Sequence, residues 1–255
     1  MTAGRPRPLR CLSIGEGPPI VVLHGYAMQP RTYLPLARLL ADRARVVIPA
    51  VFALPGRWTF DHALACLELT LDDLGIERTS LLGHSFGGGL ELGLAARQPE
   101  RVVECVFGDT LGVREGFGLA AEALRSPLGI LGMASLPAAT AFFQSFATHP
   151  LELVEAAWWG FSSDRDADIE AVVGAGIPCH VLWAERDTLL LRSDGREFAR
   201  RLNATFTVAE SPPGYGHIDH DWMFDDPELF VAHLERLGLA ALSGSNQQAL
   251  PDAAH

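Results

Sequence analysis

One short segment of the chain carries the residues of a nucleophile. Gly83, Ser85 and Gly87 form a Gly-x-Ser-x-Gly pattern after an apolar run that begins at Thr79. A serine hydroxyl attacks a carbonyl only when a general base takes its proton, and a sharp strand-to-helix turn presents such a serine to its substrate. Glycine is expected on both sides because a Cβ would clash where strand and helix approach each other. Alone, the pattern also fits a glycine-rich loop that binds a phosphate or nothing.

Groups that could activate this serine follow other apolar runs. His24, Asp187 and His217 each lie at or shortly after the end of a segment typical of a strand. In an open parallel sheet the carboxyl ends of the strands form the ligand crevice. We therefore expect these side chains to meet Ser85 at one edge of a sheet.

The elements that must position these residues alternate along the chain, which is typical of a mostly parallel α/β sheet covered by helices. Strands are expected at residues 9–14, 20–23, 45–48, 79–84, 101–108, 178–183 and 205–208, and helices at 32–42, 60–74, 88–97, 193–202 and 227–237. Such a sheet would have seven or eight strands. Its core would comprise residues 1–110 and 176–240, followed by a flexible tail at 241–255.

No strand pattern is evident between residues 111 and 175, and residues 126–151 contain no Asp, Glu, Lys or Arg. A membrane span needs about 20 continuous apolar residues, and three prolines with several polar residues interrupt this run. We predict an inserted cap of two or three short helices over a substrate pocket. The candidate pocket residues are His24, Met133, Phe142, Phe143, Phe146 and Trp158. The alternative is that the cap aromatics only fill the interior of the cap.

Composition limits the classes of function. The 255 residues are 48% hydrophobic and 20% charged, which is typical of a globular domain. A net charge of −11 opposes binding to nucleic acid or anionic membranes and favours a small neutral or apolar substrate. The four cysteines lack the spacing of a metal or redox site, and the first ten residues lack the apolar segment of a signal peptide. We expect reduced cysteines, a cytoplasmic location, no metal and no cofactor.

Together these segments resemble the α/β-hydrolase superfamily, in particular its capped serine esterase-like branch. The resemblance is carried by Leu23-His24-Gly25-Tyr26, by residues 83–88, by residues 182–187, by Gly216-His217 and by residues 226–230. It implies a triad with Ser85 as nucleophile, His217 as general base and then acid, and Asp187 as the carboxylate that orients the histidine. It also implies that the backbone N–H groups of Tyr26 and Phe86 form the oxyanion hole.

Two residues compete for these roles. His220 follows His217 closely but lacks a preceding glycine, so His217 is preferred as the base. Asp109 also ends a predicted strand, yet the residues before Asp187 match the family better. The loop at 49–57 departs from the family pattern, which leaves one wall of the pocket undefined.

The resemblance implies a serine hydrolase that cleaves carboxylic esters of small apolar substrates through an acyl-enzyme intermediate. A lactonase, a thioesterase, a perhydrolase or a hydrolase of carbon–carbon bonds would use the same residues. A hypothesis of another class is a small-molecule receptor with residual hydrolase activity.

Overall fold

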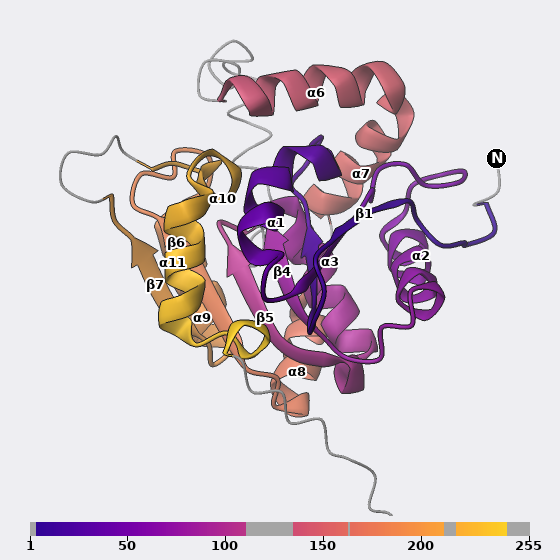
Figure 1. Ribbon diagram of the computed structural model, residues 1–255. Coiled ribbons are helices and arrows are strands. Elements are labelled where there is room, and N and C mark those ends of the chain that lie inside the picture. The colour runs from indigo at the N-terminus through magenta and orange to yellow at the C-terminus, as the bar shows by residue number, and fades with distance from the viewer. Residues whose placement is uncertain (1–3, 111–134, 163, 212–217, 244–255) are drawn as a thin grey trace, which may run out of the picture.

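The protein is described by a computed structural model over residues 4–110, 135–162, 164–211 and 218–243 (Figure 1). A seven-stranded sheet in the order β1-β3-β2-β4-β5-β6-β7 forms its centre. The strands are β1 (Cys11–Ile14), β2 (Pro19–Leu23), β3 (Arg45–Pro49), β4 (Thr79–His84), β5 (Val102–Gly108), β6 (Cys179–Ala184) and β7 (Thr205–Ala209). Only β1 pairs antiparallel with its neighbour. The predicted mostly parallel α/β sheet is confirmed, with seven strands.

Helices cover both faces of the sheet because its central strands are apolar on both faces. In β2, Val21 and Leu23 belong to one core cluster, whereas Ile20 and Val22 belong to the other, as the two-residue period of a strand requires. The first cluster is covered by α2 (Phe60–Asp73), α3 (Phe86–Arg97), α8 (Asp166–Ala175) and α9 (Arg192–Arg201). The second is covered by α1 (Leu34–Leu40), α10 (Trp222–Asp225) and α11 (Pro227–Leu237).

The order of the strands in the sheet changes direction at β2. The next strand along the chain, β3, pairs on one side of β2, and β4 pairs on the other, with Leu23 opposite Gly83. A switch point of this kind opens a crevice at the carboxyl ends of the two strands. The loop after β2 and the turn after β4 therefore lie side by side.

Two helices of the predicted insertion lie over this edge of the sheet (Figure 1). They are α6 (Leu136–Thr148) and α7 (Pro150–Ser162). Tyr26, in the loop after β2, donates its hydroxyl to the carbonyl of Leu153 in α7 at 2.9 Å. Helix α8, by contrast, packs against α3 in the flanking layer. Residues 111–134, which the predicted cap includes, lie outside the described part of the chain.

The C-terminal end of the described chain packs more closely than the expected tail. A short 3-10 helix, η3 (Ala240–Leu242), buries Ala241 and Leu242 in the second cluster. The backbone N–H of Ala240 also donates to Glu104 Oε1 at 2.9 Å. The packed core therefore extends beyond residue 240. None of the helices in the described ranges has the length and apolar character that spanning a bilayer requires.

Candidate active site

Ser85 is the single residue between β4 and α3. Its backbone has φ +52° and ψ −119°, a conformation that an L residue adopts only under strain. A Cβ on Gly87 would lie 2.0 Å from the carbonyl oxygen of Leu23, and a Cβ on Gly83 would lie 2.6 Å from the Cα of Gly88. The two glycines are thus required by the close approach of strand and helix.

One backbone bond and one side-chain bond fasten this turn to the end of β5 and the residues after it. The N–H of Ser85 donates to the carbonyl of Gly108 at 3.0 Å, and the hydroxyl of Thr110 donates to the carbonyl of Ser85 at 2.8 Å. Sequence reasoning did not single out Thr110. Its position directly after a strand at the ligand edge was the available signal.

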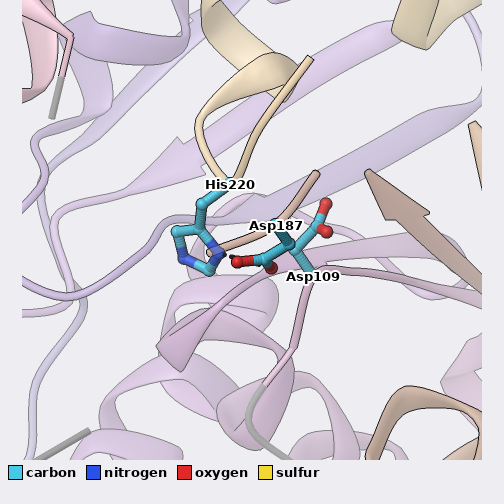
Figure 2. Close-up of side chains that lie close together, drawn as sticks. All are labelled: Asp109, Asp187 and His220. Atoms are coloured by element: carbon cyan, nitrogen blue, oxygen red, sulfur yellow. Dashed lines mark hydrogen bonds and ion pairs between the residues drawn. The ribbon is translucent and has the colours of Figure 1, made fainter. Parts of the chain in front are cut away.

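A histidine and an aspartate from distant loops meet beside the strand ends (Figure 2). His220 Nδ1 lies 2.9 Å from Asp187 Oδ2, and the backbone N–H groups of Leu189 and Leu190 each donate to Asp187 Oδ1 at 2.8 Å. Because a carboxylate only accepts hydrogen bonds, the Nδ1 of His220 carries the proton. Its Nε2 is then the nitrogen that could accept a proton from a nucleophile.

This pairing changes the preferred base. His217, favoured by the sequence, lies outside the described residues. His220 lies in a turn two residues before α10, and its side chain contacts Asp187 directly. His220 is therefore the candidate base among the described residues.

Bonds between two loops bring this pair together. The N–H of Arg186 donates to the carbonyl of Ile218 at 3.3 Å, and the N–H of Ile218 donates to Ser211 Oγ at 3.0 Å. Ser211 in turn contacts Glu185 Oε1 at 3.1 Å. These bonds connect residues 185–186 with residues 211–218, so the residues around His220 alone do not predict them.

Asp109, the competing acid, lies next to the pair but has other partners. It is fully buried, with φ +42°. Its Oδ1 accepts from the N–H of Ala184 at 2.8 Å, and its Oδ2 accepts from the indole N–H of Trp222. Asp109 therefore ties β6 and α10 together, while Asp187 holds the histidine.

Polar side-chain atoms of Asp109, Asp187 and His220 all lie within 4.8 Å of one another. Such a spacing also suits a metal ion. The carboxyl oxygens of Asp109 and Asp187 and the Nδ1 of His220, however, already take part in hydrogen bonds. The arrangement thus fits an acid–base pair with a supporting carboxyl group.

The charges of the pair stabilise each other. Burial alone would lower the pKa of His220, but the adjacent Asp187, with smaller effects of Asp109 and Asp221, raises it to about 9. Burial alone would raise the pKa of Asp187, and His220 outweighs burial and lowers it. Burial and the charge of Asp187 raise the pKa of Asp109 well above its usual range. The pair is therefore ionic at neutral pH.

The expected oxyanion donors lie on the two segments that meet at the switch point. Phe86 is the first residue of α3, so its N–H has no acceptor within the helix. Tyr26 lies in the loop after β2, and its ring centroid is 6.0 Å from that of Phe86. Both backbone N–H groups are placed at the carboxyl edge, where they remain candidates for the oxyanion hole.

The expected pocket residues differ in their surroundings. Phe142 and Phe146 are partly buried, with ring centroids 4.6 Å apart, and Phe146 faces Tyr26 at 6.4 Å. Phe143 is 60% exposed and Trp158 is 72% exposed, so neither is enclosed by a pocket. Met133 lies outside the described residues.

His24 is buried and bonds to the backbone of the loops after β2 and β3, so it does not line a substrate pocket. It is 1% exposed; its Nε2 accepts from the N–H of Val51 at 3.3 Å, and its Nδ1 contacts the carbonyl of Gly25 at 3.2 Å. Burial lowers its pKa to about 4, so the ring is neutral.

The loop after β3 supplies an aromatic residue that sequence reasoning missed. The ring centroid of Phe52 lies 5.4 Å from that of Phe86 and 5.8 Å from that of Tyr26. This loop is the one that departs from the family pattern. An aromatic side chain shortly after a strand end was the signal that could have identified it.

Comparisons with known proteins agree with this fold. A family model described as "Alpha/beta hydrolase family" matches residues 20–233. A protein named putative non-heme haloperoxidase from Mycobacterium phage D29 is 28% identical over 269 residues, covering 90% of each chain. A 2-hydroxymuconate semialdehyde hydrolase of Pseudomonas putida is 34% identical over 113 residues, covering 39% of this chain and 38% of that protein.

A solved structure extends the likeness in fold. A thermophilic esterase from Thermogutta terrifontis superposes with a TM-score of 0.71 at 19% identity, covering 92% of this chain and 94% of that chain. At this identity the superposition supports the fold alone. The family match covers most of the chain, and the chain belongs to the Alpha/beta hydrolase family.

Proposed function

We propose that this chain is a serine hydrolase that cleaves carboxylic esters of small apolar substrates through an acyl-enzyme at Ser85. His220 acts as the base, and Asp187 orients it. The observation that carries the proposal is the 2.9 Å contact between His220 Nδ1 and Asp187 Oδ2 at the strand edge that also carries Ser85 on its strained turn.

In the first half of the reaction, the Ser85 hydroxyl attacks the ester carbonyl while Nε2 of His220 takes its proton. The backbone N–H groups of Tyr26 and Phe86 stabilise the oxyanion that forms. One such donor typically contributes about 10²–10³ in rate. The protonated His220 then gives its proton to the leaving alcohol, and Asp187 stabilises the imidazolium throughout.

In the second half, His220 takes a proton from water, and the resulting nucleophile attacks the acyl group on Ser85. The same oxyanion donors act again. Collapse of the second tetrahedral intermediate releases the carboxylic acid and returns the proton to Ser85.

The decisive experiment compares hydrolysis of p-nitrophenyl acyl esters by the wild type and Ser85→Ala. A fluorophosphonate should label the wild type at Ser85 and leave the variant unlabelled. Ser193→Ala, at an exposed position on α9, is the matched control and should keep full activity and labelling. Unchanged ester hydrolysis in Ser85→Ala, or labelling at another residue, would reject the proposal.

The names of the relatives suggest two other reactions with the same residues. A perhydrolase would transfer the acyl group from Ser85 to hydrogen peroxide instead of water, giving a peracid, and a carbon–carbon hydrolase would release a carbanion equivalent instead of an alcohol. Peracid formation from acetate and hydrogen peroxide, or cleavage of a β-diketone, faster than any ester in the panel would favour them. Tight binding of a small ligand with negligible turnover of every class would favour a receptor.

A further inference from the structure

A buried chain of three hydrogen bonds joins the parts of the candidate site. The N–H of Gly25 donates to the hydroxyl of Tyr33 at 3.0 Å. That hydroxyl lies 2.6 Å from His84 Nδ1, and His84 Nε2 lies 2.8 Å from the backbone carbonyl of His220. The chain thus starts in the loop that carries the expected oxyanion donor, passes the residue next to the nucleophile and ends on the residue that carries the base.

The direction of every bond follows from the chemistry of its ends. The carbonyl of His220 only accepts, so Nε2 of His84 must carry a proton. In a neutral imidazole Nδ1 is then the acceptor, and the hydroxyl of Tyr33 must donate to it. The oxygen of Tyr33 remains free to accept from Gly25. No member has an alternative direction that satisfies all three bonds.

The buried surroundings keep these three hydrogen bonds in one arrangement and the ring of His84 in one protonation state. Tyr33 is fully buried, His84 is 1% exposed, and the ring of Phe224 packs edge-on against both. Burial and the neighbouring His220 lower the pKa of His84 to about 3, so the ring stays neutral wherever the enzyme would work. A Cβ on Gly25 would lie 3.0 Å from His84 Nδ1, which explains why glycine occupies this position.

We propose that Tyr33 and His84 are positioning residues: through this one-directional chain they hold the backbone of His220 in register with Ser85 and with the oxyanion loop. This inference rests on the proposed function. Neither side chain touches substrate. Their effect reaches the reaction through the placement of the base, whose imidazole is fixed at its other end by Asp187.

Two substitutions of His84 separate its bond to the carbonyl of His220 from its bond to Tyr33. His84→Gln places an amide N–H₂ near the former Nε2 and keeps a donor for the carbonyl of His220. His84→Leu removes both bonds. A displacement of about 1 Å costs on the order of 10² in rate, so we expect His84→Leu to lose roughly that factor in kcat with KM changed less than about twofold. His84→Gln should recover most of the loss.

Tyr33→Phe removes only the hydroxyl and should lower kcat to an intermediate level. If the three bonds act as one unit, adding Tyr33→Phe to His84→Leu should cause no further loss, since the first change has already broken the chain. Additive losses would show that the two residues act separately and would overturn the proposal.

His62→Gln is the matched control for stability. His62 is another buried histidine, whose Nε2 contacts the carbonyl of Pro55 at 3.1 Å, away from the site. It should lower the melting temperature about as much as His84→Gln and leave kcat unchanged. Nitrogen NMR of His84 should show a protonated Nε2 and an unprotonated Nδ1. The opposite tautomer would contradict the proposed direction of the hydrogen bonds.

The outcomes distinguish this inference from the proposed function. An inactive Ser85→Ala together with fully active Tyr33→Phe and His84→Leu would reject the positioning role alone. An active Ser85→Ala would reject the proposed function, whatever the other variants do.

Discussion

The pKa values of the histidines shift in opposite directions on the two sides of the site, the side of Ser85 (the nucleophile side) and the side of His220 (the base side). On the nucleophile side, His24 and His84 are buried without a carboxylate partner of their own, and their pKa values fall to about 4 and about 3. On the base side, His220 is just as buried but faces Asp187, and its pKa rises to about 9. The rings of His84 and His220 are only 5.0 Å apart. Burial is common to all three, so the partner decides which histidine can carry a proton.

The largest expected effect tests which histidine belongs to the base side. His220→Ala should reduce kcat by several orders of magnitude, because loss of a triad histidine costs about 10⁶ in a serine protease. His217→Ala should keep most of the activity. The measurement is kcat on the most reactive p-nitrophenyl ester, and the opposite ranking would return the role to His217.

The next effect compares the two carboxyl groups. Asp187→Asn should lower kcat by about 10⁴, since an amide neither stabilises the imidazolium nor fixes its tautomer. Asp109→Asn should cost far less, because the carboxyl oxygens of Asp109 accept from Ala184 and Trp222 and make no bond to the histidine in the described structure. Equal losses in the two variants would mean that the carboxyl groups share the role of the acid.

The strained turn at Ser85 was largely predictable from the sequence, whereas the contact between His220 and Asp187 was not. Gly83, Ser85 and Gly87 form a recognisable local pattern, although the clash that requires Gly87 is with the carbonyl of Leu23 in β2. The choice between His217 and His220 depends on bonds between residues 186 and 218 and between Ile218 and Ser211, which no local pattern encodes. The glycine before His217 therefore gave no information about the pairing of His220 with Asp187.

The same contrast limits what could be expected of the pocket. Apolar composition predicted a helical cap within residues 111–175, which include α6 and α7, but composition does not tell which face of a helix turns inward. Phe143 and Phe146 are three residues apart, and the structure exposes the first and packs the second toward Tyr26. Phe52 was missed because its loop follows no regular period.

The pH dependence of kcat/KM should follow the protonation of His220. Only neutral His220 can accept the proton of Ser85, so kcat/KM should rise with pH through an apparent pKa of about 9. Asp187, Asp109 and Asp221 all favour the protonated ring, whereas His84 is neutral and has no charge to oppose it. An inflection near 6.5 would show that the ion pair with Asp187 is weaker than its geometry indicates.

The pH dependence of stability should separate the two sides. His24 and His84 have folded pKa values below the unfolded value of about 6.5, so the unfolded chain binds up to about two more protons as pH falls below 6.5, and stability decreases there. His220 behaves oppositely: its contribution is complete below about 6.5 and is lost as pH rises through about 9. Urea unfolding of His84→Gln between pH 4 and 7 should show a shallower acid slope than the wild type. An unchanged slope would mean that the unfolded state does not gain that proton.

The smallest expected effect concerns the cap, and it compares two phenylalanines on one helix. Each buried CH₂ of an acyl chain contributes about 0.8 kcal/mol, roughly a fourfold gain in kcat/KM per carbon until the pocket is full. Phe146 packs toward Tyr26 beside the site, so Phe146→Ala should flatten this dependence with little change on acetate. Phe143, at 60% exposure, is the control, and Phe143→Ala should keep the wild-type profile. A wild-type profile that peaks at acetate and responds to neither substitution would mean that the aromatic residues of α6 pack only against the protein.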